Sequence, residues 1–277
     1  MTQHITTARA TTAQPSTAAQ PSTKDSTENQ AAGRHADKVA LVMGGARGIG
    51  AGIVRLLAAE GARVTFTYAS ATSEAEELEK TIAASGGTAV GVKANSSDRS
   101  QVREVIAELA ALQGRIDIVI ANAGGGTKKL VAELSDEEID RMIDVNIRGT
   151  LDTIRFSTPH MRRGGRVIVI GSVSATHFPD DITSIYGMTK GAVASLVRGM
   201  SRELGPRGIT INNVQPGPVD TPANPADGPF GDMLRETIPV GRFGKVTEIA
   251  SLVSHIASED GGYINGASLD IDGGYSA

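Results

Sequence analysis

Short apolar runs alternate with segments of helical periodicity along most of the chain. Apolar residues recur every three or four positions in segments such as 49–57 and 102–109, as on one face of a helix. The alternation of strands with amphipathic helices is typical of repeated βαβ units. The pattern predicts an α/β fold, a single-domain, Rossmann-type, doubly wound parallel sheet of about seven strands flanked by helices. The expected strands are residues 38–43, 63–68, 88–93, 116–121, 166–171, 209–214 and 267–272.

Residues 1–36 differ in composition from the rest of the chain. Thr, Ala, Gln, Ser and Pro dominate, and the run AQPST occurs twice, at 13–17 and 19–23. Such a segment buries too little apolar surface to offset the entropy lost on ordering. It lacks the continuous apolar stretch of a secretory signal, and a transit peptide is the alternative. We therefore expect a disordered tail over 1–36 and one folded domain over 37–277.

Charge and cysteine content narrow the classes of partner. The chain has 27 Lys and Arg against 31 Asp and Glu, a formal charge of −4, which argues against nucleic acid as a partner. It has no run of about 18 apolar residues, so no membrane span is expected. There is no cysteine, and the five histidines show no metal-ligand spacing, so no metal is expected. These features favour a cytoplasmic protein with a small-molecule partner.

A glycine-rich turn, MGGARGIG, directly follows the first predicted strand and precedes an apolar helix. Gly44, Gly48 and Gly50 have the spacing GxxxGxG. Glycine permits the tight turn and the close approach of a pyrophosphate, whose charge the helix N-terminus attracts. A glycine cluster alone is more often structural. Its place after the first strand of a βα array favours a dinucleotide site.

The end of the second predicted strand indicates which dinucleotide binds. This segment, FTYAS, lacks the carboxylate that would bind the ribose 2′-hydroxyl of NAD, and the first acid that follows is Glu74. Arg47 in the glycine turn offers a positive charge for a 2′-phosphate, although a solvated loop arginine is the alternative. The sequence therefore predicts NADP(H).

In order along the chain, the motifs of residues 37–277 resemble those of the short-chain dehydrogenase/reductase family, including its 3-oxoacyl reductases. The glycine turn resembles TGxxxGxG, with Met43 where threonine is usual, and we expect a local backbone contact to be lost there. ANAG resembles NNAG, with Ala121 in place of the first asparagine. NSSD resembles DVxD, with Asn95 in place of the aspartate that faces adenine.

Two motifs near the end of the chain extend the resemblance. INNVQPGPVDT at 211–221 resembles NxVxPGxxxT, and GASLDIDGG at 266–274 resembles the last strand of the family. The resemblance implies that cofactor-binding residues follow the strands along the chain. These residues are Gly44, Arg47, Gly48, Ile49, Gly50, Ser70, Asn95, Asn122, Ala123, Gly124, Tyr186, Lys190, Pro216, Gly217, Val219 and Thr221.

A further set of motifs resembles the catalytic residues of the family. DVNIRG places Asn146 in the active-site asparagine position, and Tyr186 and Lys190 form YxxxK. GSVSA places Ser172 where the catalytic serine is expected, fourteen residues before the tyrosine, one more than the commonest spacing. Ser174 is the rival assignment. The position of Ser172 directly after the strand RVIVIG favours it.

The reaction explains why these residue types belong together. Reduction of a carbonyl needs a proton donor and groups that stabilise charge on the oxygen. The resemblance implies that Tyr186 donates the proton, Lys190 supplies a positive field and holds the nicotinamide ribose, Ser172 binds the substrate oxygen and Asn146 holds a water. A Tyr/Lys pair at i, i+4 by itself shows only a shared helical face. Lys190, however, lies on the apolar stripe, where a lysine usually has a partner or a function.

The sequence thus predicts NADPH-dependent reduction of a ketone to a secondary alcohol by a homo-oligomer, a tetramer or dimer. The expected substrate is small and moderately hydrophobic, a keto-acyl or keto-lactone metabolite. Residues 222–234 are expected to form a flap over it. The alternative is a non-catalytic dinucleotide-binding regulator or ligand-sequestering protein on the same fold. One histidine and four apolar residues are also expected around the substrate. They are His177, Phe178, Ile182, Ile185 and Met188.

Overall fold

Seven parallel strands form a single sheet in the computed structural model, which describes residues 33–178 and 180–277. Their order is β3-β2-β1-β4-β5-β6-β7, so the predicted doubly wound sheet is confirmed. The direction of winding reverses between β1 and β4, and ligands of such sheets bind at the carboxyl ends of the strands beside this point. The strands are β1 (Val39–Met43), β2 (Arg63–Tyr68), β3 (Thr88–Lys93), β4 (Ile116–Ala121), β5 (Met161–Ile170), β6 (Thr210–Pro216) and β7 (Ser268–Ile271).

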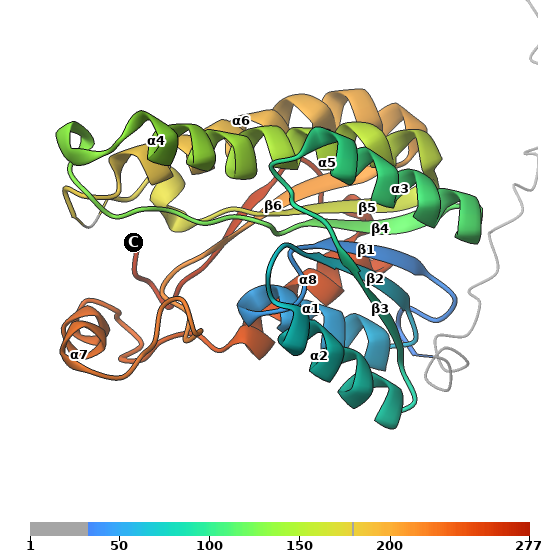
Figure 1. The fold of residues 1–277 in the computed structure, drawn as a ribbon, viewed down its shortest axis with the longest axis horizontal. Coiled ribbons are helices and arrows are strands. Elements are labelled where there is room, and N and C mark those ends of the chain that lie inside the picture. Colours follow the sequence, from blue (N-terminus) through green and yellow to red (C-terminus); the bar gives the residue numbers. More distant parts are fainter. Residues whose placement is uncertain (1–32, 179) are drawn as a thin grey trace, which may run out of the picture.

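Helices cover both faces of the sheet (Figure 1). One layer holds α1 (Gly48–Ala59), α2 (Thr72–Ala84) and α8 (Val246–Ala257). The other layer holds α3 (Arg99–Gln113), α4 (Asp136–Ile143), α5 (Thr150–Ser157) and α6 (Ser184–Leu204). A short helix, α7 (Pro229–Glu236), stands apart from both layers near the carboxyl ends of the strands (Figure 1). Shorter turns are η2 (Val131–Glu133), the π-turn η3 (Asp144–Gly149), η4 (Thr158–His160), η5 (Val173–Ala175), η6 (Gly205–Arg207) and η7 (Asp260–Tyr263).

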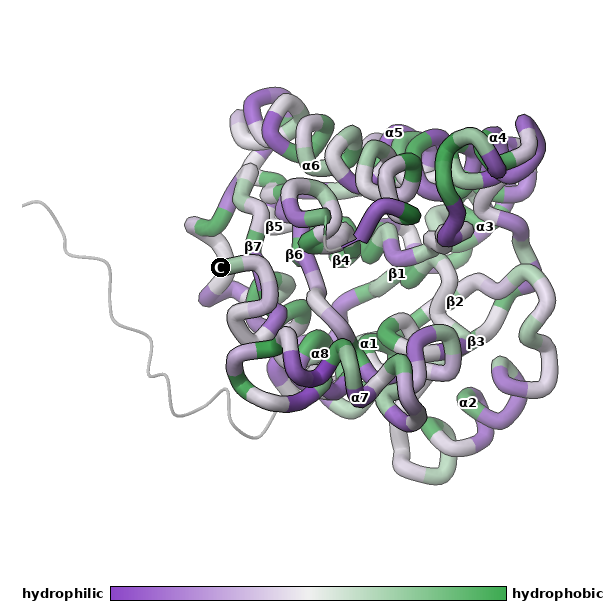
Figure 2. Tube along the Cα trace, turned by 90° about the vertical axis from the view of Figure 1, so that its left-hand side faces the viewer, coloured by the Kyte–Doolittle hydropathy of each residue, from purple (hydrophilic) through white to green (hydrophobic). Residues whose placement is uncertain are grey.

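The apolar core lies in two layers, one on each face of the sheet. All five residues of β1 are buried, because a central parallel strand is covered on both faces. Ile53 and Leu57 of α1 pack on one face, and Ile154 of α5 packs on the other. Figure 2 shows the hydrophobic positions concentrated along the central strands, with hydrophilic positions on outlying elements such as α2.

The fifth strand begins earlier than its apolar run predicts. It was expected at 166–171, but β5 begins at Met161, which pairs with Ile116 of β4. The register then shifts, and Arg166 pairs with Ile118. The first part of β5 is polar and exposed and contains Gly164 at φ +89°. Such a segment has no apolar periodicity, so the sequence pattern missed it.

Residues 33–36, which the sequence boundary assigns to the tail, pack against the folded domain. The backbone N–H of His35 donates to the Glu60 carbonyl at 2.8 Å, and the His35 side chain is fully buried. Polar composition alone gave no sign of this contact, so the boundary at residue 36 was placed too late. The remaining tail prediction, for 1–32, lies outside the described residues.

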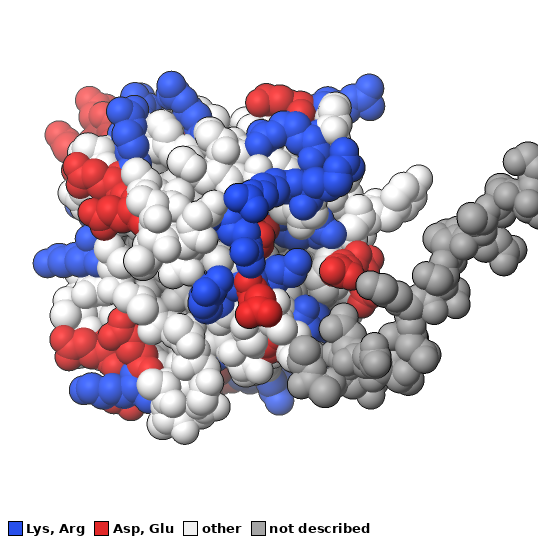
Figure 3. Space-filling view, turned by 90° about the vertical axis from the view of Figure 1, so that its right-hand side faces the viewer, with Lys and Arg blue, Asp and Glu red and all other residues white. Residues whose placement is uncertain are grey.

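The end of the molecule where the strands begin carries many Lys and Arg side chains (Figure 3). Arg162 and Arg163, exposed in the first part of β5, lie at this end of the sheet. The net negative charge is therefore unevenly distributed. Within the described segments, no helix has both the length and the apolar character needed to cross a membrane.

Candidate active site

A cleft of about 740 Å³ opens at the carboxyl ends of the strands, beside the reversal between β1 and β4. It is lined by the turns that follow β1, β2, β3, β4, β5 and β6, and by parts of α7 and the C-terminal segment. Every predicted catalytic and cofactor residue lines this cleft except Asn146. Motifs far apart in the sequence are thus brought to one site, as the βα pattern requires.

The glycine turn after β1 is held against the loop after β4. Gly44 and Gly48 have φ +73° and +54°, a region that side chains other than glycine rarely adopt. A Cβ on Gly44 would lie 2.9 Å from the Cα of Ala123, so the two loops touch through backbone. The Asn122 amide donates to the Gly44 carbonyl at 2.7 Å. The result is a bare backbone cradle of the kind that accepts a pyrophosphate.

Met43 does not cost the turn a backbone contact, contrary to the expectation. The N–H of Gly44 donates to the hydroxyl of Thr67 at 3.0 Å, and this hydroxyl donates weakly to the Met43 sulfur at 3.7 Å. Thr67 is buried in β2, beside β1. A neighbouring strand supplies a hydroxyl, which the motif comparison along one segment did not reveal.

Arg47 is the N-cap residue of α1 and lies at the end of β2 that lacks a carboxylate. Its side chain is 60% exposed, and its guanidinium nitrogen is 4.0 Å from a carboxylate oxygen of Glu74. The backbone N–H of Glu74 and the Ser73 hydroxyl lower the pKa of the Glu74 carboxyl, and Arg47 adds a smaller effect. Ser70 also lines the cleft here. This corner of the cleft thus has an exposed cation with only a distant counter-ion.

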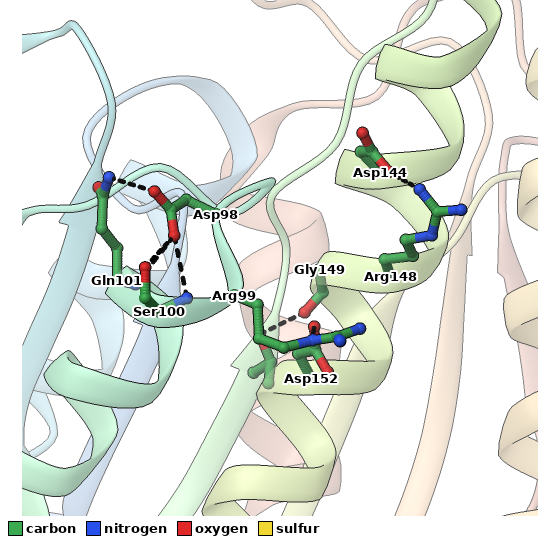
Figure 4. A network of polar contacts seen from close by, with 9 residues as sticks. Asp98, Arg99, Ser100, Gln101, Asp144, Arg148, Gly149 and Asp152 are labelled. Carbon is green, nitrogen blue, oxygen red and sulfur yellow. Dashed lines mark hydrogen bonds and ion pairs between the residues drawn. The ribbon is translucent and has the colours of Figure 1, made fainter.

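A polar network at the start of α3 shapes the turn that carries Asn95, and Figure 4 shows the part of it around Asp98, Ser100 and Gln101. Asp98 caps α3 by accepting from the N–H groups of Ser100 and Gln101. Gln101 in turn accepts from the N–H of Asn95 at 2.9 Å. The Asn95 side-chain oxygen accepts from Ser97, so its NH₂ group remains as the donor to a ligand. Asn95 lines the cleft, and its role toward adenine stays a prediction.

The tyrosine, the lysine and the serine all line the cleft. Tyr186 lies in the first turn of α6, and its ring rests on Gly126, where a Cβ would come within 2.6 Å of the ring. The Lys190 ammonium lies 5.6 Å from the centre of that ring and donates to the Ile170 carbonyl at 2.9 Å. An ammonium has three N–H donors, so others remain for a ligand. Lys190 is 5% exposed, which confirms its place on the buried face.

Ser172 follows β5 and combines two functions. Its hydroxyl oxygen accepts from the N–H of Ser174 at 3.1 Å and so caps the turn η5. Accepting that bond leaves the O–H group free to donate into the cleft. Ser174 also lines the cleft, so position alone does not exclude the rival assignment. The assignment to Ser172 remains a prediction.

Asn146 occupies a π-turn, η3, between α4 and α5, and it is buried. Its side-chain oxygen accepts from the Gly125 N–H at 3.0 Å, and its NH₂ group donates to the Gly125 carbonyl at 2.8 Å. The same NH₂ group donates to the Thr189 hydroxyl at 2.9 Å. Thr189 donates to the Tyr186 carbonyl at 2.7 Å. The asparagine side chain therefore holds the loop beneath Tyr186 and does not itself face the cleft.

The substrate end of the cleft differs from the expectation. None of the five residues predicted around the substrate is among the described residues that line it. Phe178 packs over Gly187 of α6 instead and is 51% exposed. The predicted flap does contribute to the lining of the cleft, through residues at its start and through helix α7. Phe230 and Leu234 of the predicted flap line the cleft, whereas Lys128, Asp180, Thr183 and Tyr275 are among the lining residues that sequence reasoning missed.

Little in the sequence marks the missed residues. Lys128 follows three glycines after β4, which indicated a loop but not its direction. Tyr275 is the third residue from the end of the sequence and follows two glycines, a hint that the chain turns there. The described residues contain no cluster of three His, Asp or Glu side chains able to hold a metal ion.

The sequence of this chain is similar to those of several known proteins. The family model described as enoyl-(acyl carrier protein) reductase matches residues 44–276. A cyclic-di-GMP-binding biofilm dispersal mediator protein of Escherichia coli is 39% identical over 245 residues, 88% of this chain and all of that protein. A 3-oxoacyl-[acyl-carrier-protein] reductase of Staphylococcus epidermidis is 36% identical over 86% of this chain and 98% of its own length.

Solved structures show the same fold over the same span. A short-chain dehydrogenase/reductase from Serratia marcescens is 45% identical with a TM-score of 0.86, and the match covers 88% of this chain and all of that one. A short-chain dehydrogenase from Burkholderia cenocepacia, solved in complex with NADP, is 39% identical with a TM-score of 0.86 and the same coverage.

Proposed function

The chain belongs to the short-chain dehydrogenase/reductase family of oxidoreductases, and from this premise we propose that it reduces a ketone to a secondary alcohol with NADPH. The convergence of Tyr186, Lys190 and Ser172 beside the glycine cradle supports the proposal most strongly. Tyr186 and Lys190 come from α6 and Ser172 comes from the turn after β5, and only the folded sheet brings them together. The 3-oxoacyl reductase relative acts on a ketone of an acyl chain, which supports the same reaction class.

The residues present fit a bound dinucleotide. The left-handed glycines leave a cradle that a Cβ would fill, and the N-terminus of α1 faces it. Arg47 lines the cleft and would pair with a ribose 2′-phosphate, and no carboxylate ends β2. The Burkholderia cenocepacia relative was solved with NADP. These observations together support NADP(H) over NAD(H).

The chain would contribute the proton and the electrostatic environment of the reaction. Bound NADPH would supply the hydride for the carbonyl carbon, so that negative charge would develop on the carbonyl oxygen. Tyr186 donates its hydroxyl proton to that oxygen, giving the alcohol and a phenolate. Lys190 stabilises the phenolate by its positive charge, and Ser172 donates a hydrogen bond to the same oxygen. Asn146 acts on these groups through the loop that it holds.

Turnover by the purified protein tests this proposal. NADPH consumption should appear with a panel of ketones, and NADH should support it less efficiently. Tyr186→Phe should lower kcat by about a thousandfold or more, because it removes the acid while the ring keeps its place on Gly126. NADPH binding by this variant, measured by calorimetry, should stay within about twofold of the wild type. An active Tyr186→Phe enzyme would exclude the proposed role of the tyrosine.

A second candidate is the sequestration of a ligand without turnover. The E. coli relative is described as binding cyclic-di-GMP and mediating biofilm dispersal, which favours such a role for this chain. The complete set of Ser172, Tyr186, Lys190 and Asn146 argues for catalysis instead. Calorimetry with cyclic-di-GMP discriminates the two. Tight binding by the wild type and by Tyr186→Phe, without NADPH consumption on any ketone, would favour sequestration.

A further inference from the structure

The last six residues of the chain return to the cleft and are held there by one carboxylate. Asp272 accepts from the N–H of Gly274 at 2.9 Å, from the N–H of Ser276 at 2.8 Å and from the Ser276 hydroxyl at 2.6 Å. These hydrogen bonds lower the pKa of the Asp272 carboxyl against the opposing effect of its burial. The turn is therefore closed by three charge-assisted bonds, which are stronger than neutral ones.

Two consecutive glycines complete this turn. Gly273 and Gly274 have φ +67° and +86°, so side chains other than glycine would be strained at both positions. The carbonyl of Gly273 accepts from the N–H of Val240 at 3.2 Å, and Gly274 lies against Pro239. The C-terminal turn is thus attached to the segment that follows α7. In Figure 1 the C-terminus lies at the same end of the molecule as α7.

The turn directs Tyr275 into the wall of the cleft. Its ring meets the His177 ring edge-on, with 5.1 Å between the ring centres. Tyr275 is partly buried and lines the cleft together with Thr183 and Asp180. Burial, and then the charge of Asp180, raise the pKa of the Tyr275 hydroxyl, so it remains protonated near neutrality. The residue presents a flat apolar ring with a hydroxyl donor at its tip.

Aromatic side chains are scarce in this protein, yet they gather in the cleft. The chain has four tyrosines, five phenylalanines and no tryptophan. Tyr68, Tyr186, Phe230 and Tyr275 line the cleft. Tyr68 lies at the end of β2, on the cofactor side, whereas Phe230 belongs to α7 and Tyr275 to the turn attached next to α7. Phe230 and Tyr275, from different segments, therefore both contribute an aromatic ring to the lining of the cleft.

We propose that Tyr275 determines substrate specificity by providing a flat wall that selects ketones carrying a ring. This inference rests on the proposed ketone reduction. A substrate ring packed against Tyr275 gains dispersion and edge-to-face contact, which a small acyclic ketone cannot make. Asp272 and the two glycines act as positioning residues, because they hold the C-terminal turn in place and do not line the cleft.

Steady-state kinetics with one ring-containing and one acyclic ketone tests the proposed selection by Tyr275. For Tyr275→Ala, the KM for 1-tetralone should rise about tenfold, while the KM for 2-butanone and both kcat values should change less than about twofold. Tyr275→Phe keeps the ring and should retain a KM for 1-tetralone near the wild-type value. Tyr263→Ala is the matched control, because Tyr263 is fully exposed and does not line the cleft. Equal losses on both ketones, or none on either, would overturn the proposal.

A binding measurement separates this inference from the proposed reaction. Calorimetry with 1-tetralone and the NADP⁺ complex, in which no reduction occurs, should show binding to the wild type and about tenfold weaker binding to Tyr275→Ala. Absence of NADPH consumption with both ketones would defeat the proposed reaction, yet the binding result would still decide the role of Tyr275. Unchanged affinity in Tyr275→Ala, or no binding to the wild type, would overturn the inference.

Discussion

The fold places Arg47 at the start of α1, and we expect its side chain to act on the cofactor through its positive charge. Its backbone begins α1, and its side chain extends into solvent with Glu74 as a distant partner. An exposed ion pair at 4.0 Å contributes little to stability, so replacing Arg47 should leave the fold intact. Its guanidinium has five N–H donors in a planar fork, which suits a phosphate.

Arg47→Gln should therefore change cofactor preference and nothing else. We expect the KM for NADPH to rise about tenfold, because a charge-assisted contact to the 2′-phosphate is lost, while the KM for NADH stays within about twofold. Steady-state kinetics with both cofactors checks this. Arg55→Gln, an exposed arginine on the same helix, is the control. A parallel rise in both KM values would show that Arg47 contacts a part common to NAD and NADP.

At the scale of the element, the helix pair α4–α5 departs from regular geometry where it meets the site. The π-turn η3 widens the helix by one residue, and turns of this kind are frequent at functional sites. Asn146 lies in this turn with its amide turned toward Gly125 and Thr189. The hydroxyl of Thr189 joins the amide to the Tyr186 carbonyl in the first turns of α6. The Asn146 amide thus links the loop at Gly125 to α6 through the buried Thr189 hydroxyl.

Thr189→Val tests this link, because valine keeps the shape and removes the hydroxyl. Asn146 would lose one acceptor inside the core, which costs about 1–3 kcal/mol, and Tyr186 would be less firmly placed. We expect kcat to fall about tenfold or more and the KM for NADPH to change less than about twofold. Thr189→Ser should restore kcat. Thr153→Val, which removes another buried hydroxyl bonded within its own helix, should lower stability with little effect on kcat.

The elements that could be predicted from sequence are those whose signal is local. Central strands such as β1 are continuous apolar runs, and the glycine turn is defined by its spacing, so both were found. The early start of β5 and the π-turn were not, because a polar strand segment and a one-residue widening leave no periodicity. Tyr275 was missed because its place depends on a turn whose partners, Val240 and Pro239, are more than thirty residues away.

At the scale of the whole molecule, the positions of the charged residues and histidines are more informative than their numbers. The net charge of −4 gave no sign of the basic end where the strands begin (Figure 3). The five histidines, likewise, showed no ligand pattern, yet His35 is fully buried. It lies between the end of α1 and the helix α8, so it joins the first described residues to one helical layer.

The His35 contacts define its protonation state. Ser254 donates to a carboxylate oxygen of Glu60, so its hydroxyl oxygen accepts from Nε2–H of His35 at 3.2 Å. The other ring nitrogen, Nδ1, is buried without a hydrogen-bond partner among the described residues. Protonation would place an N–H there with no acceptor. Burial accordingly lowers the pKa of His35, although Glu60 opposes this, while Arg34 and Lys38 reinforce it.

This lowered pKa makes folding stability depend on pH in a stated direction. The unfolded chain takes up a proton on this histidine near pH 6.5, and the folded chain does so only at lower pH. The stabilising contribution is therefore complete above about pH 6.5 and is lost as pH falls below it. The melting temperature of the wild type should decline from pH 7.5 to 5.5, and this decline should be shallower for His35→Gln. At pH 7.5 the variant should melt a few degrees lower, since about 1 kcal/mol corresponds to about 2–4 °C in a domain of this size.

His255→Gln is the control, because His255 is an exposed histidine on α8, and this variant should keep the wild-type dependence of melting temperature on pH. The wild-type dependence in His35→Gln would mean that another group causes it.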